Sequence, residues 1–174
     1  EPELAQKFPD IKTWAGQGID DRTATLRFDI TQFGFHAQVL SANGSVYIDP
    51  YSRNDVQHYI SYYKRNFSPP AGETWQCLVP DDAHKQHPIH PGQGGGGIDP
   101  RDSDGQLRTY RAAVAATGED TAFHGGTVAA GLAAVTTSMN RVNGVYERDF
   151  SVRMNLVANN NLIIYTNSST DPFS

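Results

Sequence analysis

One stretch constrains the fold more than any other, residues 127–146, because its large apolar residues recur with the period of an α-helix. Successive members of this set are four, three, four, three and four positions apart: Val128, Leu132, Val135, Met139, Val142 and Tyr146. That spacing places them in one stripe along a helix. Thr127 follows Gly125 and Gly126 and is a suitable N-cap. The sequence therefore predicts a long amphipathic helix that needs a surface to pack against.

Strands are predicted on both sides of this helix. Residues 107–116 and 152–156 each alternate with a period of two, and residues 162–166 form a further short strand after an asparagine turn. A strand, a crossover helix and a second strand make a βαβ unit, which is usually parallel and right-handed. Such a sheet normally has both faces covered. The unit is therefore too small to be complete by itself.

The first eighty residues read as antiparallel β structure. Residues 24–30 alternate, with apolar side chains on one face and Thr25, Arg27 and Asp29 on the other. Residues 35–40 and 46–48 are predicted strands, and Asn43-Gly44 between them predicts a type I′ hairpin turn. The segment before them, residues 14–18, reads as a flexible start.

Residues 58–67 fit two structures. Their aromatic and β-branched side chains favour a strand. The spacing of Val56, Tyr59, Ile60 and Tyr63 also fits a helix, and we prefer the strand.

The clearest boundary is a hydrophilic segment that contains three histidines and a run of glycines. It divides the chain into a β-rich, pro-domain-like region (1–80), a Gly/His/Pro-rich linker (81–106) and an α/β region (107–174). The predicted fold class is α+β, an antiparallel β region followed by an incomplete βαβ unit.

Composition excludes several classes of function. The net charge is −5 and no basic stripe is present, which argues against a nucleic-acid partner. No run of 18 apolar residues exists, so no membrane-spanning segment is predicted. The single cysteine, Cys77, excludes an internal disulfide.

Two sets of motifs resemble one protein family. The first half contains IKTWAGQGIDD, FGFHAQVL and NGSVYIDPY, which resemble the pro-domain of reprolysin-like zinc metallopeptidases. In the second half, LRTYRAAVAATGE and the segment through MNRVNGVYERD (139–149) resemble the first strand, long helix and second strand of their catalytic domain, a metzincin domain of secreted bacterial type. Asp120 departs from the family pattern, which has an aromatic residue after Gly118-Glu119.

The resemblance implies a zymogen whose catalytic motif is missing from these residues. Family members hold zinc with HExxHxxGxxH. None of the six histidines is followed by glutamate, and no two are four positions apart. We therefore expect neither catalytic residues nor a bound metal here, and a chain that is latent by itself. The resemblance implies that the complete protein is a secreted zinc endopeptidase. The partners of these residues would then be the rest of the catalytic domain and a peptide or protein substrate.

Cys77 is the main candidate site residue. In family pro-domains a cysteine can occupy the zinc position that the catalytic water needs, and Cys77 lies between the β region and the linker. The alternative is a small buried residue in the predicted strand 74–79. Under the first interpretation Cys77 is an inhibitory zinc ligand.

Glu119 is the second candidate. It ends the first strand of the α/β unit, where open sheets collect functional residues. A position at the edge of the substrate cleft, a role in calcium binding and a plain solvated carboxylate all fit. His84, His87 and His90 surround Pro88 and cannot share a helix face, so they read as linker residues rather than a metal site. The glycines at 94–97 lack the Lys-Ser/Thr of a phosphate loop.

A different class of function also fits. The β region could be a non-catalytic protein-binding module, with Tyr59, Tyr62 and Tyr63 as its contact surface.

Overall fold

A computed structural model describes residues 1–68 and 106–173. Residues 1–67 and 107–174 form one compact unit. It contains a five-stranded antiparallel sheet, a parallel pair of strands, and helices that include one of 23 residues. The α+β fold class is confirmed. The division at residues 80 and 106 stays a prediction.

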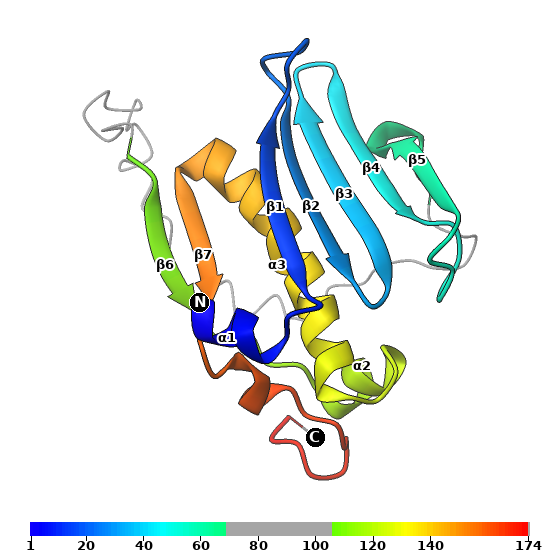
Figure 1. Cartoon of the computed structure of the whole chain (residues 1–174), viewed down its shortest axis with the longest axis vertical. Coiled ribbons are helices and arrows are strands. Elements are labelled where there is room, and N and C mark those ends of the chain that lie inside the picture. Colours follow the sequence, from blue (N-terminus) through cyan, green and yellow to red (C-terminus); the bar gives the residue numbers. More distant parts are fainter. Residues whose placement is uncertain (69–105, 174) are drawn as a thin grey trace, which may run out of the picture. The chain divides into compact units, whose positions relative to one another are not determined.

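The five strands follow one another in space in the order of the sequence (Figure 1). They are β1 Lys12–Gln17, β2 Thr25–Thr31, β3 Gly34–Ser41, β4 Gly44–Pro50 and β5 Tyr59–Tyr63. The strand interpretation of residues 58–67 is confirmed, and a short 3-10 helix, η1 Lys64–Asn66, follows β5. A meander of this kind needs only short turns, because neighbouring strands are antiparallel.

The remaining elements are α1 Pro2–Lys7, β6 Arg108–Ala112, α2 Gly118–Phe123, α3 Val128–Phe150, β7 Val152–Leu156 and the 3-10 helix η3 Asn160–Ile163. β6 and β7 are parallel and joined through α3, so the predicted βαβ unit is confirmed. The Thr127 hydroxyl accepts a hydrogen bond from the Ala130 N–H, which confirms the N-cap. Ser151 ends the helix in the left-handed conformation.

The apolar stripe of α3 builds the hydrophobic core. Leu132 and Val135 are buried together with Leu4 of α1 and Ile164, and Met139 packs against this cluster. Burying a leucine such as Leu132, which is 1% exposed, contributes about 2 kcal/mol relative to an exposed side chain. The stripe is covered over its first three turns, whereas Tyr146 near its end is 41% exposed.

The prediction of a last strand at residues 162–166 is wrong. The chain there forms η3 and then a single bridge between Ile164 and Ala116. The cause is the side chain of Asn160, which is fully buried. It accepts from the Val114 N–H at 2.8 Å and donates to the Val114 carbonyl at 3.0 Å. An amide side chain therefore takes the place of a neighbouring strand, and β6 ends four residues before the predicted limit at 116.

A second asparagine pairs with β7 in the same way. Asn143 of α3 donates to the Met154 carbonyl at 2.9 Å and accepts from the Met154 N–H at 2.8 Å. In a parallel strand the N–H and C=O of one residue point to the same side. Asn143 therefore occupies the edge of β7 that faces away from β6.

Two predictions for the β region need correction. Residues 14–18 are not a flexible start, because Lys12–Gln17 pair with β2 and the Trp14 ring stacks on Phe28 at 4.9 Å. The turn at Asn43-Gly44 is not type I′. Gly44 has φ +118°, but Asn43 is not among the described residues with positive φ, and Ser41 pairs directly with Gly44.

Candidate functional site

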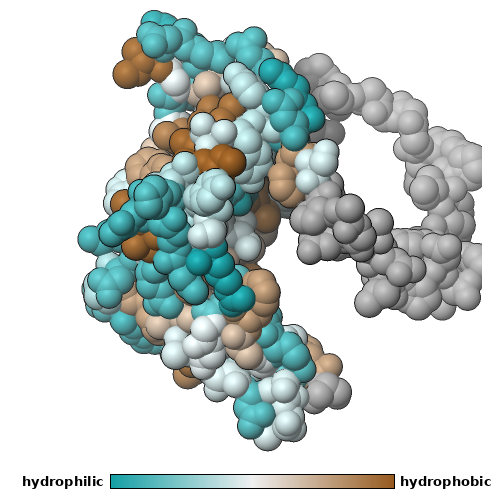
Figure 2. Space-filling model, turned by 90° about the vertical axis from the view of Figure 1, so that its right-hand side faces the viewer, coloured by the Kyte–Doolittle hydropathy of each residue, from teal (hydrophilic) through white to brown (hydrophobic). Residues whose placement is uncertain are grey.

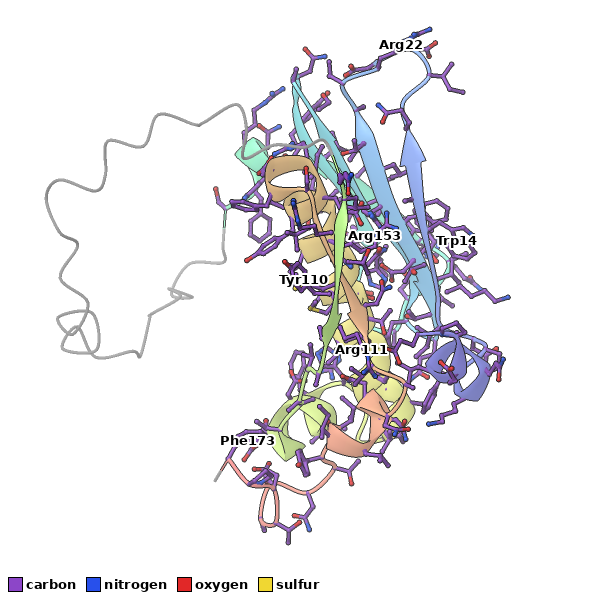
Figure 3. The ribbon with its side chains drawn as sticks, turned by 90° about the vertical axis from the view of Figure 1, so that its left-hand side faces the viewer. Trp14, Arg22, Tyr110, Arg111, Arg153 and Phe173 are labelled. Carbon is purple, nitrogen blue, oxygen red and sulfur yellow. The ribbon has the colours of Figure 1, made fainter. Side chains whose placement is uncertain are left out.

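Helix α3 lies between the two sheets, and its two long faces differ in chemistry. One face carries the apolar stripe towards β7, and the other contacts β2 and β3. In Figure 3 the five-stranded sheet lies along one side of α3, and Trp14 lies on the side of the sheet away from the helix. The sheet therefore turns its polar face to the helix. We call this contact between α3 and the strands β2, β3 and β4 the polar interface.

A buried carboxylate lies at the centre of the polar interface. Asp29 of β2 is 1% exposed. It accepts a hydrogen bond from the Thr137 hydroxyl at 2.7 Å and from the Asn140 amide at 3.4 Å, both on α3. The Nδ1 atom of His36, its partner in the register of β3, lies 3.4 Å from the same carboxylate. A buried charge needs such partners, because burying an unpaired charge is very costly.

Ion pairs extend the polar interface on both sides of Asp29. Glu147 of α3 pairs with Arg27 of β2 and with Arg153 of β7, so one carboxylate joins both sheets. Arg141 of α3 pairs with Asp49 of β4. Arg141 and Glu147 are thus half-buried ion-pair partners.

Close approach of the helix to the sheet depends on Gly144. A Cβ atom at this position would lie 2.6 Å from the Gln38 Oε1 atom and 3.1 Å from the Arg27 Cγ atom. Gly144 lies on the same side of α3 as Asn140 and Glu147, since residues four and three apart share a helix face. The glycine therefore lets the polar side chains of β2 and β3 reach the helix.

Burial and the neighbouring side chains shift the pKa values of Glu147 and Tyr62. Burial alone raises the pKa of Glu147, but hydrogen bonds and charges from Arg153 and Arg27 outweigh it and hold the pKa below its usual 4.5. Burial, together with the hydrogen bond from Tyr62 to Asp49, raises the pKa of Tyr62 to about 12. Tyr62 of β5 is therefore bound to Asp49 beside the polar interface and is not part of an exposed tyrosine surface with Tyr59 and Tyr63.

We expect acid to weaken the polar interface. A carboxylate whose pKa is lowered by folding contributes stability above its unfolded pKa of 4.5, and that contribution is lost as the pH falls through the folded pKa. The free energy of unfolding should therefore fall below about pH 4.5. Urea denaturation of the wild type and of Glu147→Gln between pH 3 and pH 7 measures this. An equally steep acid loss in Glu147→Gln would contradict it.

The described residues do not form a zinc site. No group of three or more His, Cys, Asp or Glu residues close enough to hold a metal occurs within 1–68 and 106–173. The three histidines in these ranges lie in separate pairs with carboxylates, His36 with Asp29, His58 with Asp55 and His124 with Asp120.

Of the two candidate site residues from the sequence, only Glu119 lies among the described residues. Glu119 is exposed in the first turn of α2, after the N-cap Thr117, and not at the end of a strand. Cys77 lies outside the described residues, as do His84, His87 and His90.

No described helix is both long enough and apolar enough to cross a bilayer.

The opposite face of the five-stranded sheet is apolar. A row of aromatic rings crosses it, from Trp14 to Phe28, Phe35 and Tyr59, with ring centroids 4.9 to 6.2 Å apart. Trp14 and Tyr59 are 39% and 40% exposed. Viewed from the β5 side, hydrophobic residues lie in separate patches on a largely hydrophilic surface (Figure 2).

Comparison with known families assigns part of the chain. Residues 106–174 match the model of metallo-peptidase family M12B, reprolysin-like. No curated protein and no solved structure matches the chain significantly. The match begins just before β6 and includes α2, α3 and β7, so the reprolysin-like resemblance is confirmed for this part. Peptidases of this family depend on zinc.

Proposed function

We propose, from the reprolysin-like match over residues 106–174, that this chain is the pro-segment and the leading catalytic subdomain of a secreted zinc endopeptidase. The subdomain is the β6-α3-β7 unit, and the pro-segment is the five-stranded sheet with α1. The chain is latent by itself, because HExxHxxGxxH is absent from it. In this proposal the motif lies beyond residue 174 of the complete protein.

The observation that carries the pro-segment assignment is the chemistry of the polar interface. Residues outside the family match, among them Arg27, Asp29 and Asp49, contact residues inside it through ion pairs and hydrogen bonds. Interfaces between detachable parts are more polar than permanent cores, although here the segment before β1 also packs Leu4, Phe8 and Ile11 against the apolar core. A pro-segment must hold its partner during folding and leave after cleavage. Charged contacts, which salt weakens by screening, are suited to both tasks.

Cleavage between residues 68 and 106 should leave two fragments that stay together at low salt and separate at high salt. Loss of a hydrogen bond to a charged group weakens association about tenfold, so Arg27→Gln should separate at a lower salt concentration than wild type. Size-exclusion chromatography of the cleaved chain measures this.

Arg22→Gln is the matched control. Arg22 is exposed in the loop before β2, far from α3 (Figure 3), and forms no ion pair in the described ranges. Fragments that never separate, whatever the salt concentration, would show one permanent domain and remove the pro-segment assignment.

Cys77 remains the proposed inhibitory zinc ligand of the complete proenzyme. Its substitution Cys77→Ser removes the thiolate and should speed activation, measured as the lag before peptide hydrolysis begins. An unchanged lag would leave Cys77 as a structural residue. Glu119 remains proposed at the cleft edge, and its exposure in α2 is compatible with that place.

The coding frame beyond residue 174 separates the peptidase from the alternative function. A HExxHxxGxxH motif within about 150 residues, a usual domain length, supports the peptidase. A coding frame that continues without this motif favours a non-catalytic protein-binding β module. The exposed aromatic row from Trp14 to Tyr59 is the feature that would serve such a module.

A further inference from the structure

A cavity of about 580 Å³ lies beside the polar interface. Phe33, His36 and Arg53 contribute to its wall from the β region, and His124, Ser138 and Arg141 contribute from α2 and α3. Small-molecule sites usually measure about 300–1,000 Å³. The size therefore suits a ligand such as a single amino acid or a short peptide end, and the ligand would touch both halves of the sequence.

The cavity wall is rich in cationic and hydrogen-bond-donating groups, although the whole chain carries a net charge of −5. It contains the guanidinium groups of Arg53 and Arg141 and the imidazoles of His36 and His124. Its one carboxylate, Asp49, already pairs with Arg141 and accepts from the Tyr62 hydroxyl at 2.8 Å. The carboxylates beside the imidazoles, Asp29 and Asp120, are not in the wall.

Two of these donors have no hydrogen-bond or ion-pair partner within the described part of the chain. The Nε atom of Arg141 is buried without a hydrogen-bond partner among the described residues. Arg53 lies over the Phe123 ring, with its guanidinium carbon 4.2 Å from the ring centroid, and forms no ion pair within residues 1–68 and 106–173. A guanidinium held against a ring still offers N–H groups at its edge, in a geometry that matches a carboxylate. Phe33 and Phe123 add apolar walls next to these donors.

We propose that this cavity binds a peptide carboxylate, with Arg53 and Arg141 on the carboxylate and the phenylalanine rings on the adjoining apolar side chain. The carboxylate is either the C-terminal one or that of an acidic side chain. The proposal does not depend on the peptidase assignment. Since the wall comes from both halves of the chain, the bound ligand also strengthens the polar interface by mass action.

The test is calorimetric titration of the whole chain with N-acetyl-phenylalanine, its uncharged amide and N-acetyl-aspartate amide. We expect saturable binding of at least one acid and about tenfold weaker binding of the uncharged amide, as loss of a charged hydrogen-bond partner predicts. Whichever acid binds more tightly identifies the source of the carboxylate.

Arg53→Gln should weaken the binding of that acid about tenfold, while Arg22→Gln should leave it unchanged. Arg53 is exposed, so its loss should not prevent folding, and an unchanged melting temperature without ligand checks this. Equal affinity for the acid and the amide would overturn the proposal, and so would equal affinity of Arg53→Gln and wild type for the acid. The absence of any heat of binding at about 10 mM ligand would also overturn it, because enzymes typically bind metabolites at about 1 mM or below. Binding of inorganic phosphate, together with no binding of either acid, would also overturn the proposal.

Discussion

Replacing Asp29 by alanine should destabilise the folded chain by about 3 kcal/mol. The substitution removes the acceptor of the Thr137 hydroxyl and the Asn140 amide, and it leaves the His36 imidazole without its carboxylate. Each buried donor that loses its partner costs about 1–3 kcal/mol. The midpoint of urea denaturation, measured at pH 7, reports the change.

Two variants sharpen this experiment. Asp20→Ala changes the same residue type at an exposed position before β2 and should alter stability by less than about 0.5 kcal/mol. Asp29→Asn keeps the shape and one acceptor oxygen, so it should lie between Asp29→Ala and wild type. If Asp29→Ala is as stable as Asp20→Ala, then the polar interface does not hold the sheet to α3.

Replacing Gly118 by alanine should be comparably damaging, with a loss of about 3 kcal/mol. The new Cβ atom would lie 2.6 Å from the Ser168 Cα atom and closer still to the Ser168 nitrogen. These are backbone atoms, which cannot move aside as a flexible side chain can. The shift would also disturb the hydrogen bond from the Gly118 N–H to the buried Asp171 carboxylate, which measures 2.7 Å.

Gly16→Ala is the control for Gly118→Ala. A Cβ atom at residue 16 would come no closer than 3.6 Å to its nearest neighbour, Leu26. Thermal denaturation of the two variants should show a drop of several degrees for Gly118→Ala and little change for Gly16→Ala. Equal melting temperatures would mean that residues 167–168 do not pack against the start of α2.

Local patterns explain which elements could be predicted from the sequence. The apolar stripe from Val128 and the cap at Thr127 specify α3 without any other part of the chain. The strands β2 and β3 follow from alternation in the same way. Elements that depend on a distant partner could not be predicted. β1 has no buried side chain and forms through its pairing with β2, and residues 160–163 turn because the Asn160 side chain binds Val114.

The candidate site illustrates the same limit. Alternation in β2 separates Arg27 and Asp29 from Phe28, but it does not tell which face another element covers. The usual rule buries the apolar face, whereas here the polar face packs on the helix. The partners of these residues, Thr137 and Glu147, lie far along the chain, and no local signal joins them.

The asparagine on the outer edge of β7 has a consequence for self-association. Unpaired strand edges are the templates through which sheets of different molecules join into fibrils. With Asn143 bound to the Met154 backbone, a strand of another molecule cannot pair along this edge of β7 without displacing the asparagine.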